Sequence, residues 1–573
     1  MHGGSEGSEV QELIAQKRLQ IAGKGGISGL VANKRSMFIA FFASLGGLVY
    51  GYNQGMFGQV SGMDSFSKAA GVGAIQDNPV LQGLLTSILE LGAWIGVLMN
   101  GIVADKFGRR WSVVFGVVWF LVGVIVQACT HGGDYNFILG GRFVVGVGVG
   151  ILSMVVPLYN AEVSPPEIRG SLVALQQLAI TFGIMISYWI TYGTDYIGGE
   201  GDNQSAAAWL VPISIQCVPA LILGSCIFLM PESPRWLINV GQEEKCLDVL
   251  AKLRGLDKNN DLIQMEYLEM KAQQLFEKEL EVTAYPHLQD GSTMSNIKIG
   301  FHQYKSMFTH FSTFKRVSVA CLIMTFQQWT GANFILYYAP FIFNSLGLSG
   351  RTISLLASGV VGIAMFVATI PAVLWVDQLG RKPVLISGAI VMGSCHFIVA
   401  GILGGYGGDF TGHAGAGWAA VVFVWIFAIG FGYSWGPCAW VIVSEVFSLG
   451  MRAKGISIGA SANWLNNFAV AMATPDFVAR AKYGAYIFLG LMCFFGAAYV
   501  YFFCPETKGR TLDEIDELFG DTSGTSKRER EIHNRILKDV GLLDLMGIKD
   551  EEDNEKTEEV HMEVVDAVDT ESN

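Results

Sequence analysis

Amide side chains cluster in the stretch 314–345 of this sequence. Gln327, Gln328 and Asn333 lie within seven residues, and Tyr337 follows four residues later. In a helix, Gln328, Asn333 and Tyr337 come near one face because they are five and four residues apart. Amides donate and accept hydrogen bonds, so this face suits a neutral ligand with many hydroxyl groups. Amides can also join helices inside a membrane, but three in so short a stretch exceed what packing needs.

Other polar groups stand in apolar stretches. Gln177 lies in 171–193, and Asn463 and Trp464 lie in 455–479. Glu90 precedes Gly101 by eleven residues, which places it roughly 16 Å from the end of its helix. An ionisable side chain at that depth in a membrane is a functional candidate, and the alternative is a hydrogen-bonded structural glutamate.

The composition is that of a membrane protein. Of 573 residues, 51% are hydrophobic and 15% are charged, against roughly 25% charged in soluble domains. This excludes a cytosolic enzyme, a disordered chain, a collagen and a disulfide-stapled secreted fold. The nine cysteines are scattered, and no pattern indicates a catalytic constellation, a metal site or a cofactor. We therefore expect no enzyme.

The net charge of −12 is concentrated at the end of the chain. Residues 521–573 hold 16 acidic and 7 basic side chains, which we interpret as a solvated and unpatterned acidic tail. Nucleic-acid binding would need the opposite sign of charge.

Twelve apolar segments are long enough to span a bilayer, so the predicted fold is an all-α membrane protein. The segments are 37–61, 81–104, 111–130, 136–158, 171–193, 207–230, 314–345, 352–377, 383–404, 417–446, 455–479 and 484–504. The expected domains are an N-terminal tail (1–36), a six-helix bundle (37–230), a loop with short helices (231–313), a second six-helix bundle (314–504) and an acidic C-terminal tail (505–573).

The basic residues of the short loops predict the orientation. Loops on one side carry eight Lys or Arg residues and loops on the other carry four, which puts both termini and the long loop in the cytoplasm. Asn203, in an Asn-Gln-Ser sequon, then lies outside as a possible glycosylation site.

The two halves repeat each other. Asp105 and Arg109 recur as Asp377 and Arg381, each 272 residues later. Pro231-Glu232-Ser233 recurs as Pro505-Glu506-Thr507, 274 residues later. The repetition predicts two pseudo-symmetric six-helix bundles around a central cavity.

The repeated charges are gate candidates. Glu162 and Arg169 recur as Glu445 and Arg452 with the same seven-residue gap. Cations alone would satisfy topology, so the repeated carboxylates indicate ion pairs, which we expect between the two bundles on the cytoplasmic side. The candidate gating and salt-bridge residues are Asp105, Arg109, Arg142, Glu162, Arg169, Asp377, Arg381, Glu445 and Arg452.

Several motifs together resemble the sugar porter family of the major facilitator superfamily. These are Gly101-x-x-Ala104-Asp105-x-x-Gly108-Arg109-Arg110, Pro231-Glu232-Ser233-Pro234-Arg235-Trp236-Leu237, Gln327-Gln328-x-x-Gly331-x-Asn333, Gly436-Pro437-x-x-Trp440 and Pro505-Glu506-Thr507-Lys508-Gly509. The resemblance covers about residues 35–515 and is strongest to fungal hexose and pentose transporters. It implies the major facilitator fold and a monosaccharide carrier that works by alternating access, as a uniporter or a proton symporter.

The resemblance also assigns roles to residues. It implies sugar contacts at Gln177, Gln327, Gln328, Asn333, Tyr337, Gly436, Trp440 and Asn463. Proton-coupled relatives typically have an aspartate where this chain has Asn53, and Met365 stands where an asparagine is common. Glu90 is then the proton-coupling candidate, and Asn53 favours a uniporter slightly.

The expected partners are a sugar, protons if transport is coupled, and the bilayer, with the plasma membrane as the location. The sequence specifies neither the sugar nor an oligomeric state. Two other functions are compatible with it: a non-transporting sugar sensor of the same fold, and a transporter of a polyol, inositol, quinate or a disaccharide.

Overall fold

The protein is described here from a computed structural model. The described residues are 33–71, 78–165, 168–199, 201–288, 293–346, 351–407, 410, 413–447, 451–508, 519 and 525–547. They form helices joined by short loops. The chain divides into two compact units. We call residues 34–236 and 300–520 the membrane unit, and residues 1–33, 237–299 and 521–573 the loop-and-tail unit.

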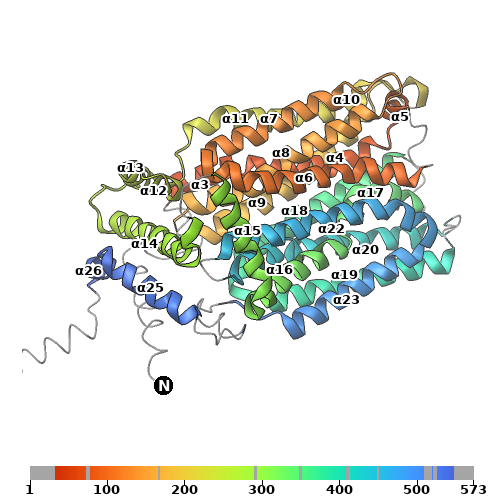
Figure 1. Ribbon diagram of the computed structural model, residues 1–573. Helices are drawn as coiled ribbons and strands as arrows, with labels where there is room; N and C mark the ends of the chain where they lie inside the picture. The colour runs from red at the N-terminus through yellow and green to blue at the C-terminus, as the bar shows by residue number, and fades with distance from the viewer. Residues whose placement is uncertain are drawn as a thin grey trace, which may run out of the picture. The chain divides into compact units, whose positions relative to one another are not determined.

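The first half of the membrane unit, residues 34–236, contains most of the red to yellow helices in Figure 1. Its helices are α3 (Lys34–Ala43), α4 (Leu45–Val60), α5 (Asp64–Ala70), α6 (Pro79–Phe107), α7 (Arg109–Ala128), α8 (Asn136–Val163), α9 (Arg169–Thr194), η3 (Gly201–Asn203), α10 (Ala207–Ile215), α11 (Cys217–Cys226) and η4 (Ile227–Leu229), followed by the short α12 (Pro234–Asn239), which leads into the other unit.

The second half, residues 300–520, contains the green to blue helices of the same unit (Figure 1). They are the end of α15 (Thr293–Thr309), α16 (Phe311–Trp329), α17 (Ala332–Ser345), α18 (Arg351–Leu379), α19 (Arg381–Tyr406), α20 (Ala414–Tyr433), α21 (Trp435–Glu445), α22 (Arg452–Ala481) and α23 (Tyr483–Phe503).

Eight stretches of the described helices are apolar and long enough to cross a membrane. They correspond to α6, α7, α8, α10–α11, α18, α19, α20–α21 and α23. The other expected spans correspond to α3–α4, α9, α16–α17 and α22. These helices carry the candidate amides, which lower their apolar character, and two of the spans are broken into shorter helices.

Local sequence explains where these helices begin and how closely they pack. Asn78 caps α6 by accepting a hydrogen bond from the Leu81 backbone at 3.1 Å, and Pro79 takes the first helical position. Gly146 of α8 lies so close to α6 that a Cβ atom there would be 2.1 Å from the Leu89 carbonyl oxygen. Only a glycine allows the two backbones to approach this far.

A break divides the span that carries most of the amides. Helix α16 ends at Trp329, and Gly331 adopts φ +90° before α17 begins. A side chain at Gly331 would be strained in this conformation, and its Cβ would lie 3.0 Å from His396 Nε2. His396 in turn hydrogen-bonds the Thr330 carbonyl at 2.9 Å. The break is therefore built into the packing of the second half.

The loop-and-tail unit contains α13 (Glu243–Arg254), α14 (Asp261–Ala284), η5 (Pro286–Leu288), α25 (Thr525–Asp539) and α26 (Leu542–Met546). Arg254 forms a buried ion pair with Glu266, and this pair joins α13 to α14. Helix α25 packs on α14, where Arg535 pairs with Glu279 and the His533 ring lies 5.2 Å from the Phe276 ring.

Our expectation of an unpatterned, solvated tail is wrong for residues 525–547. These residues form α25 and α26, and their apolar side chains are buried. The buried residues are Ile536, Leu537, Leu542, Leu543 and Met546. Their spacing places them on one side of each helix. The net charge of the whole tail gives no indication of this apolar pattern.

Candidate functional site

A network of buried amides surrounds the start of α17. The Asn333 amide donates to Gln328 Oε1 at 2.5 Å and to Asn467 Oδ1 at 2.8 Å. Its oxygen accepts from Gln54 Nε2 at 2.8 Å. Gln54 belongs to the first half and the other three residues to the second, so the network joins the halves. We define the central cluster as Gln54, Glu90, Gln328, Asn333, Tyr337 and Asn467.

Glu90 makes a further connection between the halves. It lies on α6 and is 1% exposed. Its Oε1 accepts from the Tyr337 hydroxyl at 2.6 Å, and its Oε2 accepts from Asn467 Nδ2 at 2.9 Å. A buried carboxyl group is costly unless it is hydrogen-bonded, and here both oxygens have a donor from the second half.

A pair of amides lies beside the central cluster, next to the break between α20 and α21. Gln327 Nε2 donates to the carbonyl oxygens of Trp435 and Gly436, at 2.8 and 3.2 Å, and its Oε1 accepts from Asn463 Nδ2 at 2.6 Å. Ser434, with φ −123° and ψ −88°, interrupts the helix there. The break leaves carbonyl groups for a side chain to bind.

Residues of the first half face this pair. Gln177 Nε2 lies 3.4 Å from the place that a Cβ on Gly436 would occupy. Tyr50 of α4 hydrogen-bonds Gln54, and its ring lies 5.3 Å from the ring of Trp464 on α22. Amides and aromatic rings from both halves therefore occupy one region in the middle of the membrane unit.

This arrangement suits a neutral ligand rich in hydroxyl groups. In the present state the amides hydrogen-bond mainly with one another, and a ligand hydroxyl can replace such a partner. Because each exchange replaces one hydrogen bond by another, the net gain is only about 1 kcal/mol per bond, and binding stays reversible. Within the described part of the chain, no three His, Cys, Asp or Glu side chains group as metal ligands.

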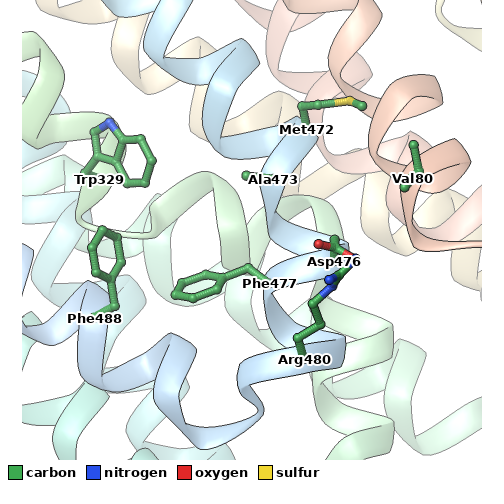
Figure 2. A pocket seen from close by; sticks show the side chains of 8 residues that line it. All are labelled: Val80, Trp329, Met472, Ala473, Asp476, Phe477, Arg480 and Phe488. Atoms are coloured by element: carbon green, nitrogen blue, oxygen red, sulfur yellow. The ribbon is translucent and has the colours of Figure 1, made fainter.

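A separate pocket opens beside α22 (Figure 2). Its lining is Val80, Trp329, Met472, Ala473, Asp476, Phe477, Arg480 and Phe488. The walls are mostly apolar, and Arg480 pairs with Asp476 at 2.8 Å. No residue of the central cluster lines this pocket, so we do not assign the hydroxyl-binding site to it.

The repeated charges form one ion pair in each half, at the ends of the helices that carry them. Arg109 binds Glu162 through two hydrogen bonds, both of 2.7 Å, and also approaches Asp105 at 3.5 Å. Arg381 pairs with Glu445 at 2.9 Å. Both pairs join helices of the same half, whereas we expected pairs between the halves.

The repeated Pro-Glu motifs also act in equivalent ways. Glu232 accepts from the backbone N–H of Arg109 at 3.2 Å, and Glu506 accepts from the backbone N–H of Arg381 at 3.0 Å. Each carboxylate thus caps the first turn of a helix, α7 or α19, where the helix dipole favours negative charge. Although partial burial acts in the opposite direction, these backbone hydrogen bonds keep the pKa of Glu506 below its usual value.

Residues 39–519 match the family model described as sugar (and other) transporter. The chain belongs to this transporter family.

Relatives in this family cover nearly the whole chain. The high-affinity glucose transporter 1 of Candida albicans is 32% identical over 544 residues, which are 92% of this chain and 93% of that protein. The quinate permease of Emericella nidulans is 30% identical over 500 residues, 85% of this chain and 89% of that protein.

A solved structure with the same fold is that of the proton:xylose symporter XylE bound to 6-bromo-6-deoxy-D-glucose. It is 28% identical in sequence, the TM-score is 0.67, and the match covers 85% of this chain and 100% of that one. The expected sugar porter family and the fold of twelve spans in two six-helix halves are confirmed. The protein is a multi-pass membrane transporter and not an enzyme.

The residues singled out in this transporter from its sequence lie in several places. Gln328, Asn333 and Tyr337 belong to the central cluster, and Gln327, Gly436, Asn463 and Gln177 lie beside it. Trp440 is partly buried against the core of the second half, one turn beyond Gly436. Met365 is buried in that core, in the middle of α18.

Two further candidates, Arg142 and Asn53, lie away from the ion pairs. Arg142 donates to the carbonyl oxygens of Leu85 and Thr86, at 2.6 and 2.9 Å, and its guanidinium lies 3.6 Å from the centre of the Phe57 ring. Asn53 donates to Gln216 at 2.6 Å within the first half.

The remaining sequence candidates lie at helix ends and in loops. Arg452 begins α22, where burial lowers its pKa although Glu445 is near. The side chains of Arg169 and Asp377, at the start of α9 and the end of α18, lie outside the described residues. Asn203 is exposed in η3.

Sequence reasoning missed two members of the central cluster. Gln54 follows Asn53 directly, and Asn467 lies four residues after Asn463, one turn along α22. An amide one helical turn from a candidate, in an apolar helix, is the signal that could have identified Asn467.

Proposed function

We propose that the protein carries a monosaccharide across the plasma membrane by alternating access. The observation that carries this proposal is the central cluster, in which neutral hydrogen-bonding groups from both halves meet in the interior of the membrane unit. A site between two halves can face either side in turn if the halves move against each other. The relatives named as glucose transporters and the xylose symporter support a sugar as the substrate.

The chemistry of the cluster supports a neutral substrate. The described hydrogen bonds of Gln54, Gln328, Asn333 and Asn467 are those of amides, which pair equally well with donors and acceptors of a hydroxyl group. We propose as sugar contacts the six cluster or neighbouring residues Gln177, Gln327, Gln328, Asn333, Tyr337 and Asn463, together with Gly436 and Trp440.

The proposed gate has two parts. On one side of the cluster, Tyr337 of α17 reaches across to Glu90, and the break at Gly331 allows α17 to move separately from α16. At the other end, the Arg109 and Arg381 ion pairs fix the loops that must separate or approach as the halves rock. We propose that both termini and the loop-and-tail unit lie in the cytoplasm, which leaves Asn203 outside.

Glu90 is the proposed proton carrier in a coupled cycle, because Asn53 has no proton to exchange. The xylose symporter among the similar structures supports coupling in the family. Uniport is the alternative, in which Glu90 serves as a hydrogen-bond acceptor between the halves.

The quinate permease among the relatives gives a specific reason to test a second substrate class. Quinate carries a carboxylate, which would need a cation. The central cluster contains amides, a tyrosine hydroxyl and the Glu90 carboxyl group but no cation, and this favours the neutral sugar. A sensor that does not transport receives no support from relatives that are named transporters and permeases.

The test is uptake by proteoliposomes that contain only the full-length protein. Labelled glucose is the first substrate, and unlabelled hexoses, pentoses, polyols and quinate compete with it. We expect saturable uptake that other monosaccharides inhibit. Binding of glucose without flux would instead indicate a sensor, and uptake of labelled quinate without uptake of glucose would indicate a quinate carrier.

A further inference from the structure

Helix α15 has two unlike faces. From Gly300 onward it belongs to the membrane unit. Met307 on one face is fully buried in the core of the second half, and Gln303 contacts Lys454 at the start of α22. These contacts attach the helix to the bundle.

The other face presents aromatic rings to the outside. Phe301 is 69% exposed and Phe308 is 54% exposed, and they are seven residues apart, which places them on one stripe of the helix. Tyr304 lies between them and is also exposed. Large apolar side chains grouped in this way indicate a surface that a protein partner or a membrane covers.

The stripe continues onto a surface that must face lipid. Phe311, at the start of α16, is 73% exposed, and Phe314 and Leu322 follow on the same transmembrane helix. His310 between α15 and α16 has extended backbone angles, so the chain turns there. In Figure 1, α15 runs across the direction of α16 instead of continuing it. The stripe thus extends the bilayer-facing surface of α16 onto a helix that does not itself span.

The charge of this segment has one sign. Exposed Lys305 and Lys315 accompany the rings, and the Lys315 ammonium lies 4.7 Å from the centre of the Phe311 ring. No Asp or Glu occurs anywhere from residue 291 to residue 376. Lysines beside aromatic residues are the pattern of a helix that lies in the plane of a membrane with anionic lipids.

We propose that α15 from Gly300 onward lies in the cytoplasmic interface of the bilayer, where Phe301 and Phe308 enter the acyl boundary and Lys305 and Lys315 bind the phosphates of anionic phospholipids. The side of the membrane follows from the orientation under the proposed function, but lipid binding does not depend on which solute is carried. Because α15 leads directly into α16 and the Gly331 break, bound lipid would fix the base of the proposed gating span.

The experiment uses the full-length protein in nanodiscs of equal parts phosphatidylcholine and phosphatidylserine. A photoreactive p-benzoylphenylalanine replaces Phe308 in one sample and Leu256, an exposed residue after α13, in the matched control. We expect lipid adducts at position 308 and few at position 256. Adducts of position 308 with the same chain or with a second copy would overturn the proposal, because protein would then cover the stripe.

The lysines are tested by the ratio of phosphatidylserine to phosphatidylcholine adducts at position 308. In K305Q/K315Q this ratio should fall at least about fivefold, the effect of one basic residue near an anionic surface. The control K245Q/K252Q removes the same charge from the loop-and-tail unit and should leave the ratio unchanged. An equal ratio in the wild type and K305Q/K315Q would refute anionic-lipid binding, whether or not sugar uptake is detected.

Discussion

The Tyr337 hydroxyl donates a hydrogen bond of 2.6 Å to the carboxyl group of Glu90, although the two residues belong to different halves of the membrane unit. Tyr337 follows the break at Gly331, so the bond connects a movable helix to a buried ionisable group. Any cycle that separates α17 from α6 must break this bond. The proposed sugar binding and the proposed proton exchange would therefore act on the same contact.

We predict that Glu90→Gln abolishes accumulation of sugar against a gradient while exchange of sugar across the membrane continues. Glutamine keeps one acceptor oxygen, replaces the other by an N–H donor, and carries no exchangeable carboxyl proton. The measurement is uptake by proteoliposomes with an imposed pH gradient, next to counterflow of labelled sugar. Wild-type protein whose flux ignores the pH gradient would be a uniporter, and Glu90 would then have a structural role.

Gln328→Ala should weaken sugar binding by about 1 to 2 kcal/mol, the value of a lost buried hydrogen bond. This corresponds to a rise of roughly 5- to 30-fold in the half-saturation concentration. The matched control is Asn466→Ala on α22, because Asn466 bonds Trp329 and Thr325 outside the central cluster. An unchanged half-saturation concentration in a well-expressed Gln328 variant would remove this residue from the site.

Arg109→Gln should lower the free energy of unfolding by about 3 to 5 kcal/mol, because it leaves the buried Glu162 carboxylate without its partner. Arg381→Gln should cost less, since Glu445 is more exposed. Lys382→Gln is the control. Normal stability of both arginine variants would mean that these arginines serve topology alone.

Docking of the tail should weaken as the pH falls. Burial against Phe276 holds the pKa of His533 below its usual value near 6.5, so protonation favours the undocked tail. The contribution of His533 is complete above pH 6.5 and is lost as the pH falls below that value. The protection factors of the α25 amides, corrected for the intrinsic exchange rate at each pH, should fall between pH 7.5 and 5.5 in the wild type but much less in His533→Gln. An equal fall in both proteins would exclude His533 as the cause.

The sequence indicated polar residues of the central cluster better than it indicated their hydrogen-bond partners. Gln328, Asn333 and Tyr337 stand out because helical spacing places polar groups on one face of an apolar helix. Their bonds to Gln54 and Asn467 depend on how α4 and α22 are rotated against α17, and helix rotation is decided by side-chain packing across the whole unit. Spacing within one helix carries no information about it.

The ion pairs illustrate a different error. The Arg109–Glu162 ion pair recurs in the second half as Arg381–Glu445. Each arginine therefore already has an oppositely charged partner within its own half. The repeat therefore did not require the ion pairs between the halves that we expected. In the tail we inferred a solvated segment from the net charge alone. That inference overlooked five apolar residues that are buried in α25 and α26.

The helix caps have a consequence for how the chain can be assembled. Glu232 closes the first turn of α7 and Glu506 that of α19, each from the end of its own half. The last residues of a half are thus needed to complete an early helix of that half and of no other. If the chain is divided in the linker between α14 and α15, each of the two polypeptides should therefore complete its own helix cap. Transport should be recovered when the two are made together. If the chain is instead divided before Glu232, the first polypeptide lacks the carboxylate that caps α7.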